Sequence, residues 1–153
     1  MKKEYLRLFK KRVKKKKYIL SFDQEINFDL IGLCSHHNDY RLVWNINSQL
    51  GIRLVKIDSY NSFQKSGKIS TLHSTYEYID EVNRLTYFLI KNKHEGQYLI
   101  PEKTAIDYFL FLCDNTSIRL EKIVQQLKSV PSILGAYEFN PEEISSAKNI
   151  TLT

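Results

Sequence analysis

The sequence has few of the residues that several classes of protein require. It contains only two cysteines, Cys34 and Cys113, which excludes a scaffold built on disulfides. Its five scattered glycines form no phosphate-binding loop, and neither a nucleophile elbow nor an HExxH motif occurs. No apolar run approaches the roughly 18 residues that a membrane-spanning helix needs. These absences predict a non-enzymatic protein without a catalytic residue, a metal site, a cofactor or a membrane span.

What the sequence does contain is the composition of one globular domain. Hydrophobic residues make up 42% and charged residues 26% of the 153 residues, which is typical of a folded chain of this length. The apolar stretch 18–20 is too short for a secretory signal, and both cysteines lie in apolar runs. We therefore expect a cytoplasmic protein in which residues 18–153 form a single α+β domain.

Positive charge is concentrated in a basic leader, residues 1–17. The leader holds ten Lys or Arg and one acid, a net charge of +9, whereas residues 18–153 hold 13 basic and 16 acidic residues, a net charge of −3. The leader is either a short helix or a disordered extension. Three alternatives are open for its role: it binds nucleic acid, it contacts an anionic membrane, or it is a solvated extension without a partner. In the first case Tyr5, Phe9 or Tyr18 stacks on bases. The contacts with phosphate are then Lys10, Lys11, Arg12, Lys14, Lys15, Lys16 and Lys17.

Two segments of the domain share a strand-helix-strand plan. In residues 26–58 a strand precedes a helix capped by Asn38 or Asp39, Gly51 ends the helix, and a second strand follows. Residues 106–139 repeat this plan, with an apolar strand covered on both faces and an amphipathic helix that stops before Pro131.

Between the two units, residues 59–68 read as a polar loop, and residues 70–79 and 84–93 read as an antiparallel hairpin. Residues 97–100 read as a short strand that Pro101 ends. The whole pattern predicts a two-layer α+β sandwich of ferredoxin-like type. Its sheet is expected to be mixed, with both helices on one face and the two units flanking the hairpin.

One stretch carries a family resemblance. Residues 100–110, IPEKTAIDYFL, resemble the signature of the IPExxxVDY family, with Ile106 in place of valine. Supporting motifs are residues 28–32 (FDLIG), residues 39–42 (DYRL) with Trp44 and Asn47, and Asn92-Lys93; the resemblance covers roughly residues 18–150. This family consists of uncharacterised small bacterial proteins, so the resemblance implies a bacterial protein and no particular reaction. The motif residues are Ile100, Pro101, Glu102, Ile106, Asp107 and Tyr108.

The motif also has a physical interpretation. Pro101 fixes its own φ and lacks a backbone donor, so we expect it to turn the chain sharply. Asp107 interrupts an apolar strand, and an isolated buried carboxylate is costly. We therefore favour a structural role for Asp107, receiving backbone N–H groups or pairing with Arg41 or Arg84, over a catalytic one.

A polar cluster at the expected start of the first helix is a candidate ligand site. Ser35, His36, His37, Asn38 and Arg41 lie where free N–H groups favour an anion. Residues 114–117 hold the equivalent place in the second unit, and if the two units lie side by side, both loops open on the same edge of the sheet. The alternative is that both are solvated loops. A metal site from Cys34, His36, His37 and Cys113 is disfavoured, because adjacent histidines do not easily serve one tetrahedral ion.

These features favour a non-catalytic protein-interaction or regulatory module. Its partner is another protein or its own copy, bound through sheet edges or through exposed faces of the tyrosine-rich hairpin. A nucleic-acid-associated protein that uses the leader is the first alternative, and binding of a small anion at the helix-start edge is the second.

Overall fold

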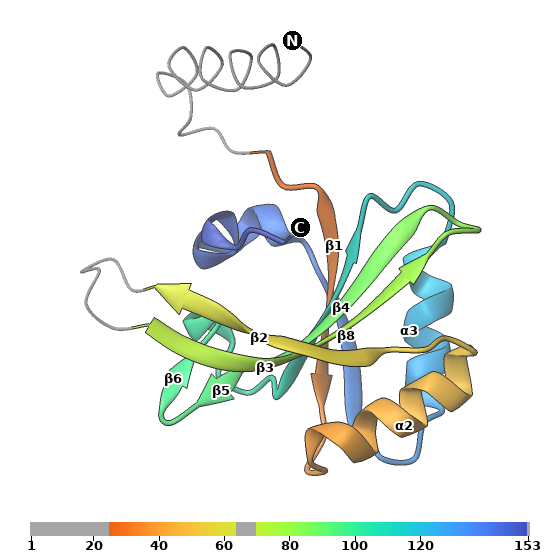
Figure 1. Ribbon diagram of the computed structural model, residues 1–153, viewed down its shortest axis with the longest axis horizontal. Helices are drawn as coiled ribbons and strands as arrows, with labels where there is room; N and C mark the ends of the chain where they lie inside the picture. Colours follow the sequence, from red (N-terminus) through yellow and green to blue (C-terminus); the bar gives the residue numbers. More distant parts are fainter. Residues whose placement is uncertain (1–24, 64–69, 153) are drawn as a thin grey trace, which may run out of the picture.

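The computed structural model describes residues 25–63 and 70–152, so the basic leader lies outside the described residues. Figure 1 shows how the elements of this part are arranged. The large sheet is built from β1 (Phe28–Cys34), β2 (Val55–Phe63), β3 (Ser70–Asp80), β4 (Leu85–Lys91), β7 (Tyr108–Cys113) and β8 (Gly135–Phe139). The other elements are the helices α2 (Asp39–Leu50) and α3 (Leu120–Lys128), the short strands β5 (Lys93–His94) and β6 (Gln97–Tyr98), and the 3-10 turns η1 (Pro101–Lys103), η2 (Pro141–Glu143) and η3 (Ser145–Asn149).

The strands of the large sheet lie in the order β2-β3-β4-β7-β1-β8, and every neighbouring pair is antiparallel. The α+β class is therefore confirmed, but the expected mixed sheet is wrong. The two strands of each strand-helix-strand unit do run parallel, yet other strands lie between them: β1 separates β7 from β8, and three strands separate β1 from β2. The ferredoxin-like arrangement is not confirmed, and the hairpin of β3 and β4 lies inside the sheet between β2 and β7.

Helix α2 begins and ends where the sequence predicts. Leu42, Val43 and Ile46 are its buried residues and hold it against the sheet. Gly51 ends the helix with a φ of 69°, a left-handed conformation that glycine adopts without steric cost. Asn38 occupies the N-cap position without a side-chain hydrogen bond, whereas Asp39 accepts one from the backbone N–H of Tyr40. Of the two caps considered, only Asp39 therefore satisfies an N–H of the first turn.

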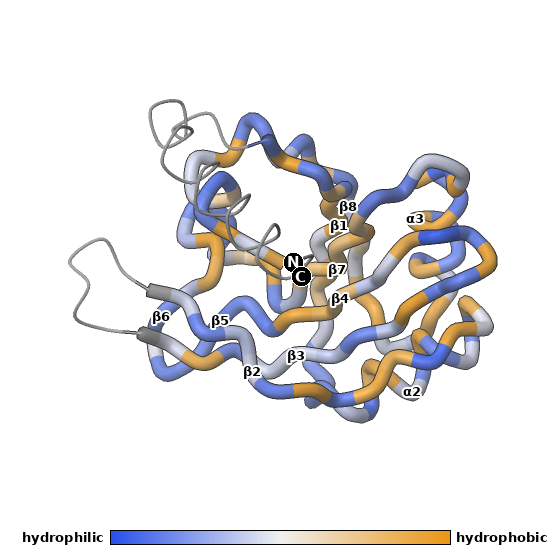
Figure 2. Tube along the Cα trace, turned by 45° about the horizontal axis from the view of Figure 1, so that its top comes forward, coloured by the Kyte–Doolittle hydropathy of each residue, from blue (hydrophilic) through white to orange (hydrophobic). Residues whose placement is uncertain are grey.

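Both faces of the sheet are covered. On one face α2 and α3 pack against a core that includes Leu33, Leu89 and Leu110. On the other face a second core is closed by residues 99–106 and by the C-terminal turns, which contribute Ile144 and Ala147. Figure 1 shows the helices and the blue C-terminal turns on different sides of the sheet, and Figure 2 shows β4 and β7 as largely hydrophobic stretches at its centre. The expected central strand is confirmed in β7, but a third, irregular layer adds to the expected two.

The expected loop at residues 59–68 is wrong over its first part, because β2 continues to Phe63. The register of β2 against β3 shifts between Ile57 and Tyr60, where β2 carries one extra residue. Such a bulge breaks the alternation of apolar and polar side chains, so the second half of the strand has the pattern of a loop. Residues 64–69 lie outside the described residues.

Candidate functional site

The family-like motif begins and ends in the buried part of the protein. Ile100, Ile106 and Tyr108 are buried, whereas Pro101 and Glu102 lie exposed in η1. Pro101 turns the chain as expected, but it does so as the first residue of a 3-10 turn, and the preceding strand pairing stops at Tyr98. The motif therefore forms a loop with an apolar underside and a polar tip.

Asn92, which the sequence analysis assigned no role, holds this loop together from below. Its side-chain Oδ1 accepts a 2.9 Å hydrogen bond from the backbone N–H of Ile100. Its Nδ2 donates to the carbonyl oxygens of Lys103, at 3.0 Å, and Ile106, at 2.8 Å. Asn92 is completely buried, although it stands between two lysines and has no local signal of burial. Only its place in the family resemblance singles it out.

Glu102 at the tip of the loop fastens the C-terminal turns. Its carboxylate accepts hydrogen bonds from both the backbone N–H and the hydroxyl of Ser146 in η3. Partial burial raises the pKa of Glu102, but the bonds from Ser146 outweigh it and hold the pKa below its usual value. The exposed acid of the motif thus has a structural partner.

Asp107 and Tyr108 connect the motif to the predicted ligand edge. The backbone N–H of Ser35 donates a 2.8 Å hydrogen bond to Oδ2 of Asp107, so the expected acceptance of a backbone N–H is confirmed. The alternative ion pairs with Arg41 or Arg84 are not formed within the described residues. The hydroxyl of Tyr108 donates to the carbonyl oxygen of His37 at 2.9 Å. Burial, together with the nearby charges of Asp39 and Asp107, raises the pKa of Tyr108.

A groove of about 810 Å³, which we name the Ser35 groove, brings the two predicted sites together. Its lining contains two lysines, Lys91 and Lys93, and two acids, Glu95 and Asp107, so the formal charges balance. Balanced charges give the groove no strong preference for an anion. Binding of a small anion at this site therefore stays a prediction. Lys91 and Lys93 were not among the predicted site residues. The groove is lined by Ser35, His36, His37, Asn38, Lys91, Lys93, Glu95, Gly96, Asp107 and Tyr108.

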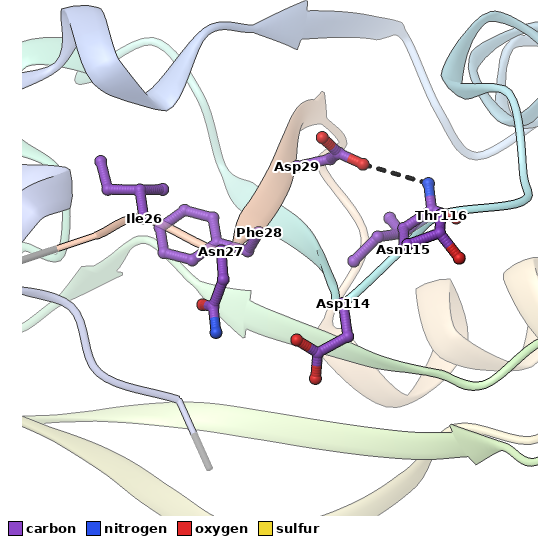
Figure 3. Close-up of a pocket in the computed structure, with 8 residues that line it drawn as sticks. Ile26, Asn27, Phe28, Asp29, Asp114, Asn115 and Thr116 are labelled. Carbon is purple, nitrogen blue, oxygen red and sulfur yellow. Dashed lines mark hydrogen bonds between the residues drawn. The ribbon is translucent and has the colours of Figure 1, made fainter.

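The second predicted loop, residues 114–117, lies at the opposite end of the sheet. Because β1 and β7 are antiparallel, Cys113 lies beside Phe28, at the start of β1, whereas Ser35 follows its end. The expectation that both loops share one edge is therefore wrong. The loop lines a separate pocket of about 270 Å³, in which Asn115 donates to Asp29 at 3.0 Å while the carboxylate of Asp114 points elsewhere (Figure 3).

The same antiparallel pairing separates the candidate metal ligands. Cys34 lies at the end of β1 that leads to His36 and His37, and Cys113 lies at the other end. Burial raises the pKa of both thiols, that of Cys113 to about 12, and nearby carboxylates add to the effect. Among the residues with described positions, no three His, Cys, Asp or Glu side chains are grouped to hold a metal ion.

Arg41, the last residue of the predicted ligand edge, lines a different groove on the outer face of α2. This Trp44 groove has a volume of about 670 Å³. Trp44 and Tyr40 lie one helical turn apart and are 70% and 67% exposed. The side-chain amide of Asn45 donates a 2.8 Å hydrogen bond to the hydroxyl of Ser132. This bond connects α2 to the chain that follows α3. The groove is lined by His37, Tyr40, Arg41, Trp44, Asn45, Pro131 and Ser132.

The tyrosines of the hairpin do not form the expected binding surface. Tyr76 and Tyr87 are buried in the core beneath the helices, and Tyr78 packs against the same core. Burial, together with the neighbouring Asp80 and Tyr78, raises the pKa of Tyr87 to about 12. The tyrosines of this hairpin are therefore core residues. The sequence analysis misplaced them because the number of tyrosines does not show which face of a strand is covered. Among the described residues, the large exposed aromatics lie elsewhere: Tyr40 and Trp44 on α2, and Tyr137 on β8.

Comparison with protein-family models finds no match, and a search of curated proteins finds no relative. The resemblance to the IPExxxVDY family accordingly stays a prediction from the motifs. Within the described ranges no helix is both long and apolar enough to cross a membrane. The predicted nucleic-acid contacts, Lys10, Lys11, Arg12 and Lys14 to Lys17, lie outside those ranges.

Proposed function

We propose that this chain is a non-catalytic protein-interaction module that binds its partner at the Trp44 groove. One observation carries the proposal: the single tryptophan of the sequence is 70% exposed, beside the equally exposed Tyr40, on a regular helix. Trp, Tyr and Arg are the residues that most often dominate the binding energy of protein interfaces. Here all three types line one groove.

The groove is formed before any partner arrives. Leu42 and Ile46 are fully buried, so α2 cannot shift without exposing core side chains. The hydrogen bond from Asn45 to Ser132 ties the helix to the opposite wall. A surface held in this way loses little conformational entropy on binding, which favours affinity.

The charge of the groove indicates the chemistry of the partner. Arg41 is exposed and forms no ion pair with another described residue. A guanidinium beside two aromatic rings suits a partner segment that presents a carboxylate next to an apolar side chain. We therefore expect an acidic, partly apolar protein segment in the groove.

Affinity capture with chemical crosslinking from the source cells tests the proposal. We expect the wild type to recover a stoichiometric protein that Trp44→Ala and Arg41→Glu lose. Val82→Ala is the matched control, because Val82 is an exposed apolar residue in the turn between β3 and β4. A partner that all four proteins recover equally would overturn the proposal. With the purified partner, a blue shift of the single Trp emission should report binding directly.

A nucleic-acid-binding role for the leader is the second candidate. It is favoured by the ten basic residues within residues 1–17, against 11 basic and 15 acidic residues in the described part. Such binding depends on the release of counterions and should weaken steeply with salt. Replacing Lys14 to Lys17 with Gln should reduce nuclease-sensitive recovery of nucleic acid while capture through Trp44 persists.

A further inference from the structure

The two edges of the large sheet differ in how well they resist another strand. On the β2 edge, the extra residue between Ile57 and Tyr60 interrupts regular pairing, and Lys56 and Asp58 place charges on the strand. Bulges and charged side chains are the usual protection of an edge strand. The β2 edge is therefore poorly suited to accept a partner strand.

The β8 edge has no bulge and carries a single charged side chain. Its register with β1 is continuous from Gly135 to Phe139, it contains no proline, and Glu138 is its only charge. Leu134 and Tyr137 are large apolar side chains on this segment, and they are 66% and 51% exposed. Within the described residues the sheet ends at β8, and no further strand pairs with its outer backbone groups.

We infer that β8 pairs antiparallel with β8 of a second copy of this chain, across a twofold axis at Tyr137. The outer N–H and C=O groups of an exposed edge strand are a template for pairing with another extended strand, and a twofold contact of identical strands closes a dimer. An axis at Tyr137 joins the two large sheets into one continuous antiparallel sheet. The proposal concerns a surface separate from the Trp44 groove and does not depend on it.

The sequence of β8 suits this register. Tyr137 meets Tyr137 of the second copy, and cross-strand aromatic pairs stabilise antiparallel sheets. Glu138 lies opposite Ala136 of the second copy, so the carboxylates do not face each other. Gly135 lies opposite Phe139, which places the smallest side chain against a large one.

Gly135 also positions the tyrosine ring. A Cβ atom added at Gly135 would lie 2.5 Å from Oη of Tyr137, so the ring lies over this glycine. An aromatic ring that covers a strand glycine compensates for the missing side chain and keeps the ring along the sheet. The exposed half of Tyr137 is thus held at the edge where the second copy would pair.

Sedimentation velocity of the full chain tests the inference. We expect the wild type to sediment at twice the mass of the 18.1 kDa chain. Tyr137→Lys should weaken the dimer by about tenfold or more, because it places two like charges at the axis. Val55→Lys is the matched control, since Val55 is 52% exposed on the β2 edge. A monomeric wild type, or equal effects of the two variants, would overturn the inference.

Disulfide crosslinking tests the register. Tyr137→Cys should form a disulfide-linked dimer under mild oxidation, because residues directly opposite on antiparallel strands lie within disulfide range. Leu134→Cys should form no disulfide-linked dimer. The wild type is the control for any crosslinking through Cys34 and Cys113. The reverse result would exclude this register. Trp44→Ala should leave the dimer intact, and Tyr137→Lys should leave partner capture intact, so the two proposals fail separately.

Discussion

The carboxylate of Asp107 accepts a 2.8 Å hydrogen bond from the backbone N–H of Ser35, a residue 72 positions earlier in the chain. This bond joins the start of β7 to the loop between β1 and α2, and the hydroxyl of Tyr108 reinforces it through the carbonyl of His37. Asp107, which directly precedes β7 and does not interrupt it, therefore connects two segments that line the Ser35 groove.

We predict that Asp107→Ala lowers the free energy of unfolding by about 1–3 kcal/mol, because it leaves the N–H of the buried Ser35 without a partner. Urea denaturation measures the change. Asp107→Asn keeps an acceptor oxygen and should lose less. Glu81→Ala, at an exposed acid in the β3–β4 turn, is the control and should change stability little. A loss no larger than that of Glu81→Ala would contradict the structural role.

Asn92 should be more sensitive than Asp107, because its side chain makes three hydrogen bonds in a fully buried position. We expect Asn92→Ala to cost about 2–4 kcal/mol. Asn92→Asp should cost at least as much, because a carboxylate would face the carbonyl oxygens of Lys103 and Ile106. Thermal and urea unfolding give the values. Asn149→Ala, an exposed asparagine in η3, provides the comparison, and equal effects would refute the assignment.

Local elements were predictable where the pattern is local. Helix α2 follows from the buried positions Val43 and Ile46 and from Gly51, and all of these signals lie within a few turns of the chain. The order of the strands depends on pairing between distant segments, such as Phe28 with Cys113, and periodicity holds no information about it. Because the sheet was expected to be mixed, the loop at residues 114–117 was predicted at the wrong end of the strands.

Individual residues of the candidate site were predictable from the sequence, but their position in one groove was not. The sequence analysis selected Ser35 and Asp107 for separate reasons, and the fold places both in one groove. Lys91 and Lys93 were missed because the pairing of β4 with β7, which sets Lys91 beside Tyr108, depends on segments that are distant in the sequence. Trp44 flanks the buried stripe of α2, but its exposure depends on the loop after α3, whose position is set by tertiary packing.

Gly32 allows the close packing of β1 against the second core. A Cβ atom there would lie 2.5 Å from Cε2 of Phe139 and 3.1 Å from atoms of Ile106. We predict that Gly32→Ala costs about 1–3 kcal/mol, because the ring of Phe139 and the buried side chain of Ile106 must both shift to admit the methyl group. Within one copy of the chain, Gly135→Ala collides with the ring of Tyr137, which is half exposed and has room to move, so it should lower the stability of the fold less. Denaturant unfolding of both variants checks the order, and the opposite order would contradict this packing.

His73 should make the stability of the protein depend on pH near neutrality. Its ring is fully buried, with Nδ1 donating to the carbonyl oxygen of Lys91 at 2.9 Å and Nε2 accepting from the hydroxyl of Thr71 at 2.7 Å. Burial lowers the pKa of His73 below its ordinary value of 6.5, the bond to Lys91 opposes this, and the nearby His94 adds to it. Protonation would turn Nε2 into a donor and remove the acceptor that Thr71 uses.

The sign of the effect follows from the lowered pKa. A group whose pKa is lower in the folded state stabilises the fold fully above its unfolded pKa, and this contribution is lost as the pH falls below 6.5 toward the folded pKa. The melting temperature should therefore fall between about pH 7.5 and about pH 5, above the range in which the carboxylates titrate. His73→Gln should flatten this decline, whereas His36→Gln, at an exposed histidine of the Ser35 groove, should leave it unchanged. An identical decline in wild type and His73→Gln would assign the pH dependence to other groups.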